Sequence, residues 1–313
     1  MIRIAAFFVF SLAFLSCETS VPQFDSQSAF KHLIEQCDFG PRNPGSEGHE
    51  NTKNYILDIT KAFADSVIVQ NFSFESALEK KSHQGFNIVA RFNPSSKTQI
   101  LIGAHWDTRP YADRDLEKKN FYKPILGAND GASGVAILLE LAKLLNKNKP
   151  TIGVNLVFFD AEDSGVSEEN ESYCKGSIFF AKNLPIPNIK EAIILDMVGD
   201  KQLSLPIERN SLNFNPTLVR QLWDRAKKLN LKAFKGVVGL AIYDDHVPLF
   251  QYANIPSIDI IDFRYPNSFK NYWHTVEDTP KNCSPESLGQ VGTLMVDYIS
   301  VSYTHLRAHE TSA

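Results

Sequence analysis

Three carboxylates stand close together in residues 160–163, directly after the seven-residue run GVNLVFF (153–159). A short run of β-branched and aromatic residues without helical spacing predicts a buried strand. Open α/β sheets bind their ligands at the carboxyl ends of such strands. Asp160, Glu162 and Asp163 are costly to hold there as anions, unless a cation is nearby or one of them keeps a proton. A single Asp would be an ordinary turn residue, but this cluster predicts a metal site.

Further polar residues follow other predicted strands or precede predicted helices. They are His105, Asp107, Asp130, Asp196, Asp244 and His274. Imidazole and carboxylate ligands without thiols are typical of catalytic zinc, which keeps one coordination position open for substrate. Glu162 and Asp163 are neighbours, so on an extended chain their side chains point to opposite sides. One of them can therefore bind the metal while the other stays beside it as a proton carrier.

Each of these residues alone has an ordinary structural explanation. Asp130 lies in GANDGASG (127–134), where it could cap the helix that follows. The small residues of this segment predict a close approach of the backbone to its neighbours. His105 and Asp107 alone could form a turn. It is their joint occurrence at successive strand ends that indicates a catalytic site.

Some polar residues are expected elsewhere. Asp259 and Asp262, near the end of a predicted strand, are expected in a turn or beside the ligands rather than among them. His49 lies in the first turn of a predicted helix and is expected at the surface. The other histidines without a motif are also expected there; they are His32, His83, His305 and His309.

Strand and helix patterns alternate along the chain, which predicts one α/β domain with a twisted, mostly parallel mixed sheet and helices on both faces. The predicted strands are residues 66–74, 86–92, 99–104, 153–159, 192–198 and 257–261. The main predicted helices are residues 28–37, 47–63, 176–183, 216–229 and 285–299, with another from the 127–134 segment to about Leu145. A long polar loop at 108–126 is expected to be functional or disordered. The catalytic domain is expected to span residues 28–303.

The first 16 residues are expected to be a signal peptide rather than part of the fold. Arg3 precedes an apolar stretch, residues 4–15, that is too short to cross a bilayer as a helix. Cys17 directly after Leu-Ser resembles a lipoprotein signal, with cleavage before Cys17 and lipid on its sulfur. The alternative is an ordinary secretory signal. We expect an exported protein, held at a bacterial cell envelope by this lipid and a tether at residues 17–27.

The net charge and the cysteine content limit which kinds of partner and metal site the protein is expected to have. The formal charge of −4 and the pI of about 6.1 do not favour nucleic acid or an anionic membrane surface. We expect a monomer whose contact with membranes is through its lipid alone. Cys37, Cys174 and Cys283 have no C-x-x-C spacing, which argues against a cysteine zinc site. One disulfide among them is possible, but the sequence does not assign it.

Taken in order, the motifs resemble those of the M28 zinc aminopeptidase superfamily. They read HWD (105–107), GANDGASG, FFDAED (158–163), LDMVG (195–199) and WHT (273–275). The resemblance runs from about Gly40 to Pro280. Within the superfamily, DDHVP (244–248) and the Trp before His274 are similar to the glutaminyl cyclases, especially their bacterial lipoprotein-type members.

The resemblance implies a role for each matching residue. One zinc ion would be bound by Asp130, Asp163 and His274. Glu162 would be the general acid and base, with Asp196 and Asp244 in a carboxylate network beside it. Trp273 would form part of the substrate pocket, and His105 and Asp107 would also face substrate. In the aminopeptidases, however, the positions of His105 and Asp196 bind a second zinc.

The implied reaction is cyclisation of an N-terminal glutamine to pyroglutamate with loss of ammonia. Its substrates would be peptides or proteins with N-terminal glutamine. A two-zinc aminopeptidase is the alternative, and an inactive zinc-binding module is the third. The chain departs from animal cyclases at Asp163, where they have Glu, and in the loop at 164–173, which lacks their Trp. Residues 304–313 resemble a translated sequencing adapter, so they are expected not to be native.

Overall fold

The computed structural model describes residues 21–310, and side-chain surroundings through residue 300. The expected signal segment 1–16 and the lipidation site Cys17 lie outside the described residues. So do residues 311–313 at the end of the expected adapter tail. No helix in the described part combines the length and the apolar character needed to cross a membrane.

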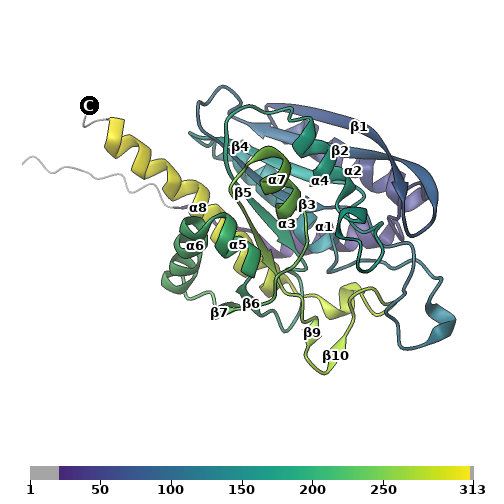
Figure 1. The fold of residues 1–313 in the computed structure, drawn as a ribbon. Helices are drawn as coiled ribbons and strands as arrows, with labels where there is room; N and C mark the ends of the chain where they lie inside the picture. The colour runs from purple at the N-terminus through teal and green to yellow at the C-terminus, as the bar shows by residue number, and fades with distance from the viewer. Residues whose placement is uncertain (1–20, 311–313) are drawn as a thin grey trace, which may run out of the picture.

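One mixed sheet carries the fold, and its strand order is β1-β2-β4-β3-β5-β8. In chain order the six strands are Ser66–Ser76, Lys81–Phe92, Gln99–His105, Gly153–Phe159, Ile189–Asp196 and Ser257–Ile261, the last of which is β8. Strand β3 is parallel to β4 and β5, and β5 is parallel to β8. Strand β2 is antiparallel to both β1 and β4. The carboxyl ends of β3, β4, β5 and β8 therefore share one edge (Figure 1).

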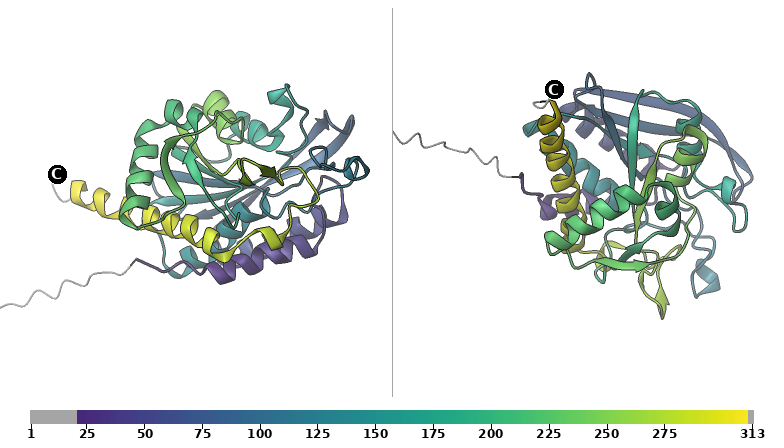
Figure 2. Two further views of the ribbon diagram at one scale, coloured as in Figure 1. Left: turned by 90° about the horizontal axis from the view of Figure 1, so that it is seen from below. Right: turned by 60° about the vertical axis from the view of Figure 1, so that its left-hand side comes forward.

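Helices cover both faces of the sheet, which confirms the predicted fold class (Figure 2). The helices of one face are α1 (Ser26–Asp38), α2 (Glu47–Phe63), α3 (Ala132–Lys147) and α8 (Pro285–Glu310). The other face packs against α4 (Lys175–Lys182) and α7 (His246–Ala253). Side chains of β3 alternate between the two cores, with Ile100 and Ile102 in one and Leu101 in the other. Burial on both faces explains why β3 and β4 have mostly apolar sequences.

Sequence patterns predicted the ends of some helices and strands correctly and missed others. Helix α2 spans the predicted residues, and the Ser46 hydroxyl accepts from the backbone N–H of His49 at its start. Strand β2 begins at Lys81 rather than at residue 86, because its pairing with β1 extends to the turn, where Ser76 faces Lys81. Helix α8 continues past the predicted end at residue 299 to Glu310, so the helix runs into the expected adapter tail.

The predicted close approach at the start of α3 is confirmed. A Cβ added to Gly131 would lie 2.4 Å from the carbonyl oxygen of His105, and one added to Gly134 would lie 2.1 Å from that of Leu195. Any larger residue at these positions would push α3 away from the ends of β3 and β5. The glycines therefore set how closely Asp130 approaches the other candidate ligands.

Several small elements between β5 and α8 complete the fold. Strands β6 (Leu205–Ile207) and β7 (Phe234–Val238) form a parallel pair, and β9 (Pro266–Asn267) and β10 (Lys270–Asn271) form a short hairpin. Between β6 and β7 lie α5 (Arg209–Phe214) and the predicted α6 (Pro216–Lys228). The sequence did not predict α5, β6, β7, β9 or β10. They are short, and β7 is mostly exposed, so they lack a hydrophobic pattern.

Candidate metal centre and active site

The polar residues predicted from the strand ends come together at one edge of the sheet. They are His105 at the end of β3, Glu162 and Asp163 in the loop after β4, Asp196 at the end of β5, Asp130 before α3, Asp244 before α7, and His274 in the loop after β10. Several of them form sets whose ligand atoms lie within 4.8 Å of one another.

Asp130, Asp163 and His274 form the first such set. His274 Nε2 lies 3.0 Å from Asp163 Oδ1 and 3.6 Å from Asp130 Oδ2, and all three side chains are buried. One atom of each residue has no hydrogen-bond partner within the described part of the chain: Asp130 Oδ2, Asp163 Oδ2 and His274 Nδ1. Buried polar atoms without partners are rare in folded proteins. Asp130 Oδ2, which is 3.6 Å from His274 Nε2, and Asp163 Oδ2 fit the ligand shell of a cation, whereas His274 Nδ1 lies 3.7 Å from Asp113 Oδ1.

The protonation of this set also fits a metal. Burial lowers the pKa of His274 well below its usual value, so the imidazole is neutral and can ligate. Burial raises the pKa of Asp163 to about 7, although Arg109 opposes the shift. A cation beside Asp163 would favour the ionised form and remove this cost. Two carboxylates and one neutral imidazole form a ligand set typical of catalytic zinc.

His105 lies among a second set of carboxylates. Its Nε2 is 3.0 Å from Asp130 Oδ1 and 3.2 Å from Asp196 Oδ1, and its Nδ1 is 3.4 Å from Asp107 Oδ1. Burial lowers the pKa of His105, but its hydrogen bonds to the three carboxylates outweigh this effect and raise the pKa well above the usual value. Asp130 faces both sets, with one oxygen toward His105 and the other toward His274.

Glu162 lies beside the first set and is partly buried. Its backbone N–H and that of Asp163 donate to the two oxygens of Asp107 at 3.0 and 3.2 Å. The thiol of Cys174 donates to Glu162 Oε1 at 3.3 Å. Burial raises the pKa of Glu162 well above its usual value, and the charges of Asp163 and Asp244 add to the shift. A carboxyl group in this state suits proton transfer near neutral pH.

Asp107 and Arg109 hold the loops after β3 and β4 together. Asp107 is fully buried and its oxygens accept from the backbone of the Glu162 loop, which gives it a positioning role. Its expected contact with substrate stays a prediction. Arg109 Nη1 donates to Asp163 Oδ1 at 3.2 Å, and Arg109 Nε and Nη2 donate to Asp113 at 2.8 and 2.7 Å. Sequence reasoning missed Arg109, whose only signal was its place in the polar loop.

A buried acidic cluster adjoins Glu162. Asp244, His246 and Asp259 have ligand atoms within 4.8 Å of one another, and Asp244 also groups with Glu162 and Cys174. Burial raises the pKa of Asp244 to about 7 and that of Asp259 well above its usual value. Burial therefore favours the protonated forms of both carboxyl groups. Asp259 lies within β8 rather than in a turn, and it is beside Asp244, as the second of the two expectations for it allowed.

Trp273 borders the metal set. Its ring stacks on that of His274 with 3.6 Å between centroids, and it contacts Phe263 at 4.9 Å. The guanidinium of Arg114 lies over the Trp273 ring, 5.6 Å from its centroid. The loop after β4 lacks the Trp of animal cyclases. Its aromatic residue Tyr173 has its ring centroid 5.8 Å from the guanidinium of Arg109. The partly exposed Trp273 is thus placed to contact a ligand bound at His274.

Asp160, the first carboxylate after β4, does not join the metal sets. Its oxygens are 3.0 Å from His49 Nε2, and His49 stacks on Trp106 at 4.3 Å between centroids. His49 was expected at the surface, but it is buried, because the first turn of α2 packs against the end of β4. His83 is also buried, 2.8 Å from Glu79, contrary to expectation.

Replacing His49 with Ala is expected to lower the free energy of unfolding by about 3–5 kcal/mol, because Asp160 stays buried without its partner. Burial lowers the pKa of His49, but the charge of Asp160 outweighs this and raises it. The stability from this pair is therefore lost as pH rises through the raised pKa of His49. Burial also raises the pKa of Asp160, so the pair is lost again when acid protonates this carboxyl group. Denaturant unfolding at several pH values measures both effects. Adding Asp160→Asn to His49→Ala should recover part of the lost stability. An equal loss in the single and the double variant would contradict this account.

The three cysteines in the described residues are free and buried. None of the possible disulfides is present. Cys174 instead contacts Glu162, a role that its position in the sequence did not indicate.

The family model of peptidase family M28 matches residues 87–299. A glutaminyl cyclase structure from Bacteroides thetaiotaomicron, bound to N-acetylhistamine, is 37% identical with a TM-score of 0.86, covering 90% of this chain and 99% of that chain. A leucine aminopeptidase precursor from the same organism is 38% identical with a TM-score of 0.85, covering 90% and 98%. Glutaminyl-peptide cyclotransferase of Boiga dendrophila is 23% identical over 318 residues, covering 90% of this chain and 83% of that protein. The chain belongs to peptidase family M28, and it shares its fold with the bacterial glutaminyl cyclases.

Proposed function

We propose that this protein cyclises the N-terminal glutamine of peptides or proteins to pyroglutamate. The observation that carries the proposal is a free acid–base carboxyl, Glu162, beside the set of Asp130, Asp163 and His274. Similarity to a glutaminyl cyclase over 90% of the chain supports the same reaction. The α-amine attacks the γ-amide carbon of its own residue. A new C–N bond closes the ring, the bond to the amide nitrogen breaks, and ammonia leaves.

Asp130, Asp163 and His274 hold one zinc ion in this proposal. Bound there, zinc would polarise the γ-carbonyl and stabilise the negative charge that develops on its oxygen. Glu162 takes a proton from the attacking amine and delivers one to the departing ammonia. Since the nucleophile and the amide belong to one residue, the reaction needs no activated water.

The neighbouring residues support this proton transfer. Asp196 and Asp244 form the carboxylate network beside Glu162, whose pKa is held high mainly by burial. Trp273 forms a wall of the pocket for the glutamine side chain. His105 and Asp107 border the site, with His105 hydrogen-bonded to Asp196.

A two-zinc aminopeptidase is the second candidate. Asp130 lies between the two sets, and a carboxylate in that position can bridge two ions. Similarity to a leucine aminopeptidase precursor also favours it. In that case His105 and Asp196 would bind the second ion, and Glu162 would take a proton from water.

Mass spectrometry of a Gln-Phe-Ala peptide incubated with zinc-loaded protein lacking residues 1–17 distinguishes the candidates. Loss of one ammonia with the chain intact is the expected result. Release of free glutamine would replace the proposal with the aminopeptidase. An unchanged peptide, with zinc bound, would leave only the inactive zinc-binding module.

We further propose that the catalytic domain, residues 28–303, acts outside the cytoplasm as a monomer. The charged and apolar pattern of residues 1–16 supports export, and Cys17 is the proposed lipid attachment site before a tether at 17–27. Intact-mass measurement of the membrane-extracted protein tests the lipid. Sequencing the native locus across Tyr303 tests the proposed adapter origin of residues 304–313.

A further inference from the structure

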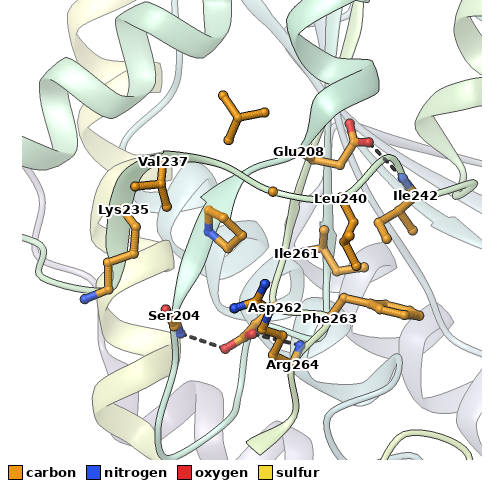
Figure 3. Close-up of a pocket in the computed structure, with 13 residues that line it drawn as sticks. Ser204, Glu208, Lys235, Val237, Leu240, Ile242, Ile261, Asp262, Phe263 and Arg264 are labelled. Atoms are coloured by element: carbon orange, nitrogen blue, oxygen red, sulfur yellow. Dashed lines mark hydrogen bonds between the residues drawn. The ribbon is translucent and has the colours of Figure 1, made fainter. Parts of the chain in front are cut away.

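An apolar pocket of about 110 Å³ opens beside β6, β7 and the end of β8 (Figure 3). Its apolar lining includes Pro206, Val238, Leu240, Ile242, Ile261 and Phe263. Val237, Val238 and Leu240 expose 61%, 54% and 52% of their surface. Large apolar side chains gathered around one hollow at this level of exposure indicate a binding surface.

The two carboxylates that line the pocket are already engaged. Glu208 accepts from the backbone N–H groups of Ile242 and Asn210 at 2.9 and 2.8 Å. Asp262 accepts from the backbone N–H groups of Ser204 and Arg264 at 2.6 and 3.1 Å (Figure 3). These bonds fasten the walls of the pocket to one another. Lys235 and Arg264 also line the pocket, but both are exposed. With its carboxylates engaged and most of its lining apolar, the interior suits an apolar occupant.

The pocket shares a wall with the candidate active site. Phe263, in its wall, packs on Trp273, and Trp273 stacks on the candidate ligand His274. Ile242, Phe263 and Trp273 belong to one apolar cluster. Ile242 also lies only two residues before Asp244. The wall that borders the metal set therefore borders the pocket as well.

We propose that this pocket binds an apolar side chain at the second or third position of the peptide substrate. The inference rests on the proposed function, which brings the N-terminus of a polypeptide to His274. The rest of that polypeptide must leave the site over a neighbouring surface. Residues of an extended chain advance by about 3.3 Å each, so the next residues reach the first surfaces beyond Trp273. The pocket is such a surface.

A comparison of three peptides tests whether the protein prefers an apolar side chain at the second or third position. Gln-Phe-Ala and Gln-Ala-Phe are compared with Gln-Ala-Ala by the rate of ammonia release. We expect at least one Phe peptide to have a kcat/KM about tenfold above that of Gln-Ala-Ala, as for added apolar groups in a pocket. Equal values for all three peptides would overturn the proposal while leaving the cyclase function intact.

A pair of leucine variants assigns the preference to this pocket. Leu240→Ser is expected to reduce the Phe-over-Ala ratio about fivefold or more, since it removes an apolar wall. The matched control is Leu184→Ser, because Leu184 is similarly exposed, at 42%, but lies outside this pocket. Its ratio should equal that of the wild type. An equal Phe-over-Ala ratio in Leu240→Ser and Leu184→Ser would overturn the proposal.

Photocrosslinking tests occupancy without turnover. Gln-Ala peptides with benzoylphenylalanine at the third position, and Gln peptides with it at the second, are irradiated with the zinc-loaded protein. We expect crosslinks at Val238, Leu240 or Phe263. Crosslinks confined to other surfaces would overturn the pocket assignment. If ammonia release fails but the crosslinks form, the cyclase proposal is wrong and the pocket still binds peptide.

Discussion

Glu162→Gln is expected to reduce kcat for cyclisation by about 10²–10⁴-fold, the usual range for losing a general acid and base. The amide has the same shape as the carboxyl group but cannot take a proton from the attacking amine. Glu162 is not in the metal set of Asp130, Asp163 and His274, so zinc content should stay at the wild-type value. Kinetics with the peptide assay and metal analysis of the same sample measure both quantities.

The same substitution provides its own stability test. Burial and the charges of Asp163 and Asp244 raise the pKa of Glu162, so its ionised form is disfavoured in the fold. A neutral amide removes that repulsion, and the variant should be at least as stable as the wild type. Glu168→Gln is the matched control, since Glu168 is exposed on the same loop. A Glu162→Gln variant with full activity would remove Glu162 from the mechanism.

His274→Ala is expected to abolish zinc binding and cyclisation together. The imidazole is one of three groups in the first set, and its neutral form is the one that ligates. Losing even an outer partner of a ligand typically costs 10- to 100-fold in metal affinity, so losing the ligand itself should cost more than about 100-fold. Equilibrium dialysis against a zinc buffer measures the affinity.

Stability should follow the metal. Zinc at about 100 times its Kd should stabilise the wild type by about 2.7 kcal/mol through linkage. His274→Ala should lose most of this gain, whereas the control His32→Ala should keep it, because His32 contacts Tyr55 on α2 instead. Retention of the full gain by His274→Ala would exclude His274 as a ligand. Retention of half of the zinc per chain would instead favour two ions, with the second at His105 and Asp196.

The sequence by itself predicted the fold class and most of the residues that come together in the candidate metal sets. Strand 153–159 could be predicted because burial on both faces leaves it apolar except at Asn155. The carboxylates after it and His105 could be placed near one another, since parallel strands end at the same edge. The small residues of 127–134 indicated the close approach of α3. These are local signals, in which nearby residues encode their own backbone.

Pairings across long separations were decided only by the tertiary structure. Asp160 and Asp163 look alike in the sequence, yet Asp160 pairs with His49, 111 residues away, and Asp163 faces His274. Ala161, between them, adopts a left-handed backbone with φ of 57°, which turns the chain after β4. The contact of the Cys174 thiol with Glu162 is likewise made by the tertiary structure. Side-chain partners depend on how strands and helices stack, and no local pattern records that order.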